Sequence, residues 1–243
     1  MIKPLSITAM LGLITAVTAL VMAGTAVYGY RAADLHFVTA IKNFEWAAYT
    51  AGGAMILSFA GLWIVRPNAT HRGLLLGLIG LILSLPLVIF ILNFEYAARA
   101  YPPINDITTD TQDPPTFWDV PYPVTYPGDQ VAELQRQGYP NLKHLEVAMD
   151  PDQVFKLASI VARDMGWEIV ANNISDMQIE AVARSFIFGF EDYVLIRLQD
   201  NNGHTRVDMR SHSRLGRIDR GTNAKHIRTY FHALKQQVEK NVK

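Results

Sequence analysis

Residues 205–228 read TRVDMRSHSRLGRIDRGTNAKHIR and carry seven Arg and Lys side chains against two Asp. Up to Ser213 this stretch alternates in the way of a β-strand, and from Asn223 it begins a run of apolar residues at helical spacing. Successive strand residues point to opposite sides of a sheet, so one side is predicted to be apolar or small and the other charged. The charged side carries Arg206, Asp208, Arg210, His212 and Arg214.

The segments around this strand predict an α+β domain over residues 145–243. A short strand at 142–148 is followed by Asp150-Pro151, which is typical of a helix start, and Gly166 ends that helix. Strands are predicted at 167–171, 177–188, 193–198 and 204–213, with a hairpin turn at 201–203, and a final helix at 223–240. The order strand, helix, four strands, helix predicts an antiparallel sheet with the helices on one face.

Residues 99–144 differ abruptly in composition from what surrounds them. Eight of the twelve prolines lie between residues 99 and 145, together with several aspartates, which indicates an extended and acidic segment. A disordered linker would lack aromatic residues, but Phe117, Trp118 and Tyr122 are among several here. We therefore expect a partly ordered segment that packs on the domain.

Residues 1–98 form the predicted membrane region. Apolar runs at about 5–30, 46–65 and 73–94 are each long enough for a transmembrane helix, which needs about 20 residues. The first run could instead be a cleaved signal peptide, but it exceeds the usual apolar length of about 7–15 residues, so we expect it to be retained. The fold class predicted for the whole chain is three transmembrane α-helices followed by a soluble α+β domain.

The basic residues of the short loops predict the orientation. The loop at 66–72 contains Arg66 and Arg72 and no acid, which favours the inside. Lys3 then also lies inside and the α+β domain outside, as in a multi-pass protein of the bacterial inner membrane with a periplasmic C-terminal domain. The middles of the three runs hold no ionisable residue, so a transport role is not expected. The absence of Cys excludes disulfides and thiolate chemistry.

Three readings of the charged strand side stay open. Its charges could pair on a solvated sheet face, with little effect on stability. Its arginines could instead form an anion site beside the start of the last helix. The residues of that site would be Arg206, Arg210, Arg214, Arg217 and Arg220. In the third reading Asp110, Asp113 or Asp119 of the proline-rich segment occupies the arginines.

Catalysis has three candidate residues, Glu180, Asp208 and His212, with Glu180 as an acid/base partner of Arg210 or His212. Positions four apart in a strand are separated by about 13 Å, so His204, Asp208 and His212 cannot bind one metal ion by themselves. Nucleotide-binding and hydrolase motifs are missing from the sequence, and neither a metal nor a cofactor is expected. The predicted location and the acidic remainder of the domain disfavour nucleic acid.

Several motifs together resemble a known family. They are Ile107-Thr108-Thr109-Asp110, Pro114-Pro115, Gly166-Trp167, Ile179-Glu180-Ala181, Gly189-Phe190-Glu191-Asp192 and VDMRSHSRLGRIDRGTNAKHIR. Over roughly 104–234 the chain resembles the DUF1499 family of uncharacterised bacterial and plastid proteins. Glu191 stands where the family pattern has Asp. The resemblance implies that the proline-rich segment belongs to the domain, but it implies no activity, substrate or cofactor. It also implies one constellation, made of Glu180, Asp192, Arg210, Ser211, Ser213, Arg214, Asp219, Gly221 and Asn223.

These observations give a ranked set of functions. The first is an inner-membrane protein whose periplasmic domain binds an anionic ligand, a lipid headgroup or a protein partner. The residues expected to bind are Glu180, Arg206, Asp208, Arg210, Ser211, Ser213, Arg214, Arg217, Asp219, Arg220 and Asn223. The second is a structural or assembly module of the envelope whose arginines clamp its own acidic segment. The third is an enzyme with a Glu or Asp as its acid/base residue.

Overall fold

The computed structural model describes residues 3–66 and 70–242. Residues 67–69 of the predicted inside loop lie outside the described residues. The chain divides into two compact units, Met1–Tyr96 and Ala97–Lys243, which are called here the membrane unit and the α+β unit.

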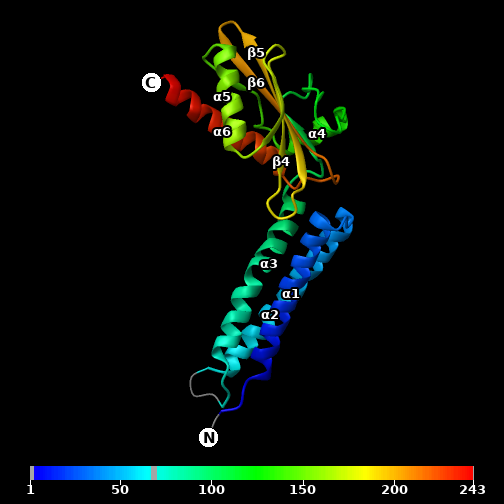
Figure 1. The fold of residues 1–243 in the computed structure, drawn as a ribbon, viewed down its shortest axis with the longest axis vertical. Helices are drawn as coiled ribbons and strands as arrows, with labels where there is room; N and C mark the ends of the chain where they lie inside the picture. The colour runs from blue at the N-terminus through cyan, green and yellow to red at the C-terminus, as the bar shows by residue number, and fades with distance from the viewer. Residues whose placement is uncertain (1–2, 67–69, 243) are drawn as a thin grey trace. The chain divides into compact units, whose positions relative to one another are not determined.

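The membrane unit is built from three helices, α1 (Ile7–Ala32), α2 (Phe37–Ile64) and α3 (Leu74–Ala100), of which α3 runs on into the first residues of the α+β unit (Figure 1). All three are long and apolar enough to cross a membrane, by their length and composition. They are longer than the predicted spans. In particular α2 begins at Phe37, so Lys42 and Glu45 lie in a helix and not in a loop.

Small residues let α1 and α2 approach each other closely. The buried side of α1 consists of Ala and Gly, and Gly12 lies so near Ser58 of α2 that a Cβ atom would come within 2.7 Å of its backbone nitrogen. Gly61 lies against the backbone of Ala9 in the same way. Such pairs give membrane helices the van der Waals contact that stabilises them in lipid.

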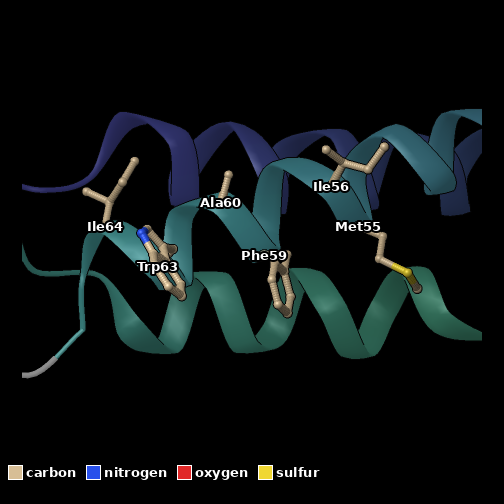
Figure 2. A pocket seen from close by; sticks show the side chains of 6 residues that line it. All are labelled: Met55, Ile56, Phe59, Ala60, Trp63 and Ile64. Carbon is tan, nitrogen blue, oxygen red and sulfur yellow. The ribbon is translucent and has the colours of Figure 1, made fainter.

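An apolar pocket lies along α2. Figure 2 shows its lining side chains, which are Met55, Ile56, Phe59, Ala60, Trp63 and Ile64. Ile56, Phe59 and Trp63 are more than half exposed. Since hydrocarbon chains are as apolar as these side chains, the pocket belongs to the surface that a bilayer would cover.

The α+β unit contains one antiparallel sheet. Its strands are β1 (Asp106–Thr108), β2 (Leu145–Val147), β3 (Glu168–Asn173), β4 (Gln178–Arg184), β5 (Glu191–Asn201) and β6 (His204–Ser213), and its helices are α4 (Asp129–Gly138), α5 (Pro151–Asp164) and α6 (Thr222–Val242). The strand order is β1-β6-β5-β4-β3, and β2 pairs with β6 further along the same edge. The predicted fold class is confirmed, with β1 and α4 as elements that the sequence did not predict.

One face of the sheet is covered by α5 and α6, which lie side by side (Figure 1). Val207 and Met209 of β6 are fully buried beneath them, as the alternation of the strand predicted. The Tyr230 hydroxyl of α6 donates to the Ala158 carbonyl of α5 at 2.9 Å, and the ring of Tyr230 stacks on Trp167. This face carries the main hydrophobic core.

The opposite face is covered by the proline-rich segment. Phe117 and Val120 of that segment form a second apolar cluster with Val182, Tyr193 and Leu195 of the sheet. Tyr193 and Leu195 have no exposed surface. The charged side of β6 is therefore an interior surface of the domain and not a solvated one.

Candidate functional site

The alternation of β6 divides the predicted site residues into two groups on opposite faces of the sheet. The arginine cluster, under the proline-rich segment, comprises Asp106, Asp110, Glu180, Arg197, Arg206, Asp208 and Arg210. The Asn223 cluster, under α6, comprises Asp192, Ser211, Ser213, Asn223 and His226. The single constellation implied by the resemblance is thus two clusters, because neighbouring residues of one strand point to opposite sides.

Arg210 occupies the centre of the arginine cluster and is 1% exposed. Its Nε and one terminal nitrogen donate to the two carboxylate oxygens of Asp106 at 2.9 and 2.7 Å. Further N–H groups donate to the carbonyls of Pro115 and Val124, each at 3.0 Å. Four of the five guanidinium donors are therefore engaged with the chain itself.

Two aromatic rings of the proline-rich segment complete the surroundings of Arg210. Its guanidinium carbon lies 4.9 Å from the centre of the Phe117 ring and 5.5 Å from that of Tyr126. Burial raises the pKa of Asp106, but hydrogen bonds from Arg210 and His212 outweigh it and hold this pKa below its ordinary value. Asp106 is thus a carboxylate, and a bidentate pair of this kind is both strong and geometrically specific.

A second ion-pair network lies beside Arg210. Arg206 donates to Asp110 and to Asp208, each at 2.7 Å, and the Thr109 hydroxyl donates to Asp208 at 2.8 Å. Arg197 donates to the exposed carboxylate of Asp113 at 2.8 Å and lies 3.6 Å from Asp208. The proline-rich segment thus supplies acidic partners to the arginines of the sheet. The third reading of the sequence expected this for Asp110, which pairs with Arg206, whereas Asp113 pairs with Arg197, an arginine outside the predicted five.

Glu180 binds the backbone of the proline-rich segment. Its two carboxylate oxygens accept hydrogen bonds from the N–H groups of Trp118, Asp119 and Val120 at 2.6, 3.0 and 2.9 Å. Glu180 is 1% exposed. Asp119 therefore contributes its backbone here, and Glu180 is a fixed acceptor that holds a turn of the chain.

The other predicted arginines lie near the end of β6. Arg214 donates to Glu191 at 2.7 Å, and its guanidinium carbon lies 4.6 Å from the centre of the Tyr122 ring. Arg217 is exposed, whereas Arg220 is partly buried and has a backbone φ of 53°. Arg206, Arg210 and Arg214 are thus paired with carboxylates of their own chain. Arg214 and Arg217 are both exposed in the described structure, and Arg214 is paired with Glu191.

The Asn223 cluster ties β6 to the start of α6. The Ser211 hydroxyl donates to the Asn223 side-chain oxygen at 2.7 Å, and the Asn223 amide donates to the Ser213 hydroxyl at 3.0 Å and to the Asn105 carbonyl at 2.9 Å. Asp219 accepts from the N–H groups of Gly221 and Asn223, each at 2.9 Å, which satisfies free donors at the start of the helix. These bonds join three parts of the α+β unit: Asn105, where the chain enters the unit just before β1, the strand β6 and the start of α6.

Two titratable groups border the Asn223 cluster. Burial raises the pKa of Asp192 to about 6, and the nearby Asp219 adds to the increase. Burial lowers the pKa of His226 to about 4, and the charge of Lys225 adds to the decrease. The His226 Nδ1 atom lies 3.4 Å from the Ser211 hydroxyl and 3.9 Å from an Asp192 oxygen.

This arrangement does not make Ser211 a nucleophile. Ser211 is fully buried, and its hydroxyl hydrogen goes to Asn223 and not to His226. A nucleophile needs access to substrate and a base that takes its proton. The cluster therefore holds β6 and α6 together through hydrogen bonds.

The three catalytic candidates are buried, and Glu180 and Asp208 are engaged in hydrogen bonds with the chain. Glu180 and Asp208 are 1% and 0% exposed, and the His212 Nδ1 atom lies 3.2 Å from Asp106. No group of three or more His, Asp or Glu side chains that could hold a metal is found among residues 3–66 and 70–242. None of these three candidate side chains has the exposure to substrate that an acid/base residue needs.

Sequence reasoning missed Asp106, His226 and Gln135. Gln135 of α4 accepts from the Thr108 N–H at 2.9 Å and donates to the Thr108 carbonyl at 2.6 Å, which attaches α4 to β1. Asp106 is 104 positions from its partner Arg210, and such a separation leaves no local spacing signal. His226 lies within residues 205–228, the stretch quoted first. Its position in the first turns of the last helix was the signal that could have indicated its nearness to β6.

Comparison with known families shows where this domain belongs. The family model described as protein of unknown function, DUF1499, matches residues 106–234, more than half of the chain. The chain belongs to the DUF1499 family. The resemblance predicted from the sequence is confirmed. A search of curated proteins found no match.

The DUF1499 region begins at Asp106, the partner of Arg210, and ends in α6. It therefore includes the proline-rich segment from Asp106 onward together with both polar clusters, while α1, α2 and α3 lie outside it. The family region corresponds to a domain in which the segment, the sheet and α6 are joined by buried polar groups.

Proposed function

We propose that this DUF1499 protein is a structural or assembly module of the bacterial envelope, anchored in the inner membrane with its α+β unit in the periplasm. In this proposal the arginine cluster holds the acidic proline-rich segment on the sheet. The domain would then work as a preformed body that other envelope components contact. Binding of an outside anion is the competing function.

The environment of Arg210 is the observation that carries the proposal. An anion could form a bidentate pair with this guanidinium only after displacement of Asp106 and of the rings of Phe117 and Tyr126. That displacement would leave the Asp106 charge buried without its partner, at a cost of several kcal/mol. The geometry therefore favours an internal clamp over an anion-binding site.

The membrane part of the proposal rests on the three apolar helices and on the loop charges. Arg66 and Arg72 lie between α2 and α3, and Lys3 precedes α1. Basic residues in short loops favour the cytoplasmic side. With three spans, the α+β unit then emerges on the periplasmic side. An alkaline phosphatase fused after Lys243 should be active in cells, and an inactive fusion of normal abundance would reverse the orientation.

The clamp is tested by comparing Arg210→Gln with Arg217→Gln in the full chain, purified in detergent. We expect Arg210→Gln to lower the melting temperature and to increase proteolysis of the proline-rich segment, while Arg217→Gln resembles the wild type. Inorganic phosphate and anionic lipid are titrated against all three proteins. Anion binding by the wild type that Arg210→Gln abolishes without a change in melting would overturn the clamp.

A further inference from the structure

The turn between β4 and β5 exposes apolar side chains. Residues 185–190 read SFIFGF, and Phe186 is 96% exposed while Ile187 is 37% exposed. Single exposed apolar residues are common on proteins, but a nearly fully exposed Phe beside an exposed Ile at a hairpin tip forms a projecting apolar point.

The turn is held in shape by hydrogen bonds. The Ser185 N–H donates to the Phe190 carbonyl at 2.9 Å, and the Gly189 N–H donates to the Ser185 carbonyl at 2.8 Å. Phe188 and Phe190 stack on each other with ring centres 4.9 Å apart. Phe188 is buried and Phe190 stacks on it, whereas Phe186 is exposed to solvent.

This turn lies at the end of the sheet where the chain enters the α+β unit. Arg184 pairs with Glu191 across the β4–β5 hairpin, and Asp192 pairs with Ser213 in β6. The Ser213 N–H in turn donates to the Asn105 carbonyl, just before β1. The turn and the chain entry are therefore neighbours along one sheet end, about 14 Å apart across three strand spacings.

The loop after β6 adds apolar and basic groups to the same end. Its Asp219 N–H donates to the Ile104 carbonyl, which fixes the loop beside the chain entry. Ile218 is 39% exposed, and Arg217 is exposed next to it. Tyr122 is 60% exposed where its ring covers Arg214. Aromatic, aliphatic and arginine side chains in this combination suit a membrane interface.

The length of the chain connection limits how far this end of the sheet can lie from the end of the apolar run of α3. The apolar run of α3 ends near Phe94, and six further helical residues of about 1.5 Å rise each lead to Ala100. Five residues separate Ala100 from Asp106. With residues 95–100 helical and the following residues fully extended, the connection spans at most about 30 Å.

We propose that the SFIFGF turn inserts into the interface of the bilayer that α3 crosses, so that Phe186 and Ile187 lie at the boundary of headgroups and acyl chains. Arg217 and Arg214 then lie near lipid phosphates, and the α+β unit is held to the membrane at a second point. The proposal requires neither the periplasmic side nor the arginine clamp, so it stands apart from the proposed function.

The chain has no Cys, which allows one probe to be placed at a chosen position. Ile187→Cys, labelled with an environment-sensitive fluorophore in the full chain, is placed in nanodiscs that hold one copy each. The matched control is His204→Cys, an exposed position at the opposite end of β6. Each protein is measured with and without Phe186→Ser, with a lipid-borne quencher and with aqueous iodide.

We expect blue-shifted emission at position 187, with quenching by the lipid-borne quencher and protection from iodide. Phe186→Ser should reverse both effects, and the position 204 label should be quenched by iodide throughout. Equal iodide quenching at positions 187 and 204 would overturn the proposal. Protection from iodide without lipid quenching would overturn it too, because a protein surface would then cover the turn. Unchanged melting of the labelled proteins shows that each is folded.

Discussion

The two faces of the sheet bury polar groups in different ways. Beneath the proline-rich segment, Arg210 and Asp106 are both charged and meet in a bidentate pair, and burial does not prevent Asp106 from having a lowered pKa. Beneath α6, Asp192 has no arginine partner, and burial raises its pKa to about 6. The first face is stabilised by charge pairing, and the second by hydrogen bonds among buried polar groups, next to an Asp192 carboxyl whose pKa burial raises to about 6.

The largest effect is expected for Arg210→Gln, which leaves Asp106 buried without its charge partner. Removal of one member of a buried pair costs about 3–5 kcal/mol in the free energy of unfolding. Urea unfolding of the full chain, followed by circular dichroism, measures the loss. Arg217→Gln is the control, because an exposed residue should change the value by no more than about 0.5 kcal/mol. Similar curves for both variants would contradict the clamp.

Glu180→Gln should have the next largest effect. The variant loses the negative charge and one of the two acceptor oxygens that bind Trp118, Asp119 and Val120. Hydrogen bonds to charged groups contribute about 1.5–3 kcal/mol, so a loss of that order is expected. Glu168→Gln, at an exposed pair with Arg184, is the matched control. Amide hydrogen exchange should also become faster at residues 118–120, and unchanged protection there would argue against the contact.

The Asn223 cluster should show itself in the pH dependence of stability. The raised pKa of Asp192 contributes stability that is present below pH 4 and is lost as the pH rises through about 6. The lowered pKa of His226 contributes stability that is present above pH 6.5 and is lost as the pH falls through about 4. The two contributions oppose each other between these values.

Asp192→Asn should therefore make the melting temperature fall more steeply than in the wild type between pH 6.5 and 4.5. His226→Gln should make the melting temperature fall less steeply over the same interval. The loss of stability from His226 is then absent, and only the opposite contribution of Asp192 is left. Differential scanning calorimetry across this interval measures both slopes. Parallel profiles for the three proteins would show that neither group titrates in the way that its burial predicts.

The smallest effect is expected at Arg214, whose side chain is 36% exposed in its pair with Glu191. Exposed pairs contribute about 0–1 kcal/mol, so Arg214→Gln should lower stability by less than either buried substitution. The difference from the wild type should shrink at high salt, which screens surface charges. A large loss that salt does not reduce would mean that packing on Tyr122, and not charge, carries the effect.

The parts of the fold that follow from local chemistry could be predicted from the sequence. The Asp150 side chain accepts from the Asp152 N–H at the start of α5, as Asp150-Pro151 indicated. Asn201 pairs with His204 across the turn that Asn202 and Gly203 form with positive φ. Each of these features depends on residues within a few positions of one another.

The arrangement of the candidate site could not be predicted in the same way. The alternation of β6 correctly separated Arg210 from Met209, but it did not reveal that Asp106 would cover Arg210 from another strand. β1 has three residues, and the buried contact of α4 uses the polar Gln135, so neither element has an apolar pattern to recognise. Arg206 and Arg210, which suggest an anion site in the sequence, therefore proved to have carboxylate partners about a hundred residues away.

The most direct test of the clamp is a double-mutant cycle with Asp106→Asn and Arg210→Gln in the full chain. If the two groups stabilise each other, the double variant loses less stability than the sum of the single variants, with a coupling free energy of about 2 kcal/mol. Urea unfolding of the four proteins gives this value. Additive losses, within about 0.5 kcal/mol, would contradict the account, since Arg210 would then act independently of the segment that covers it.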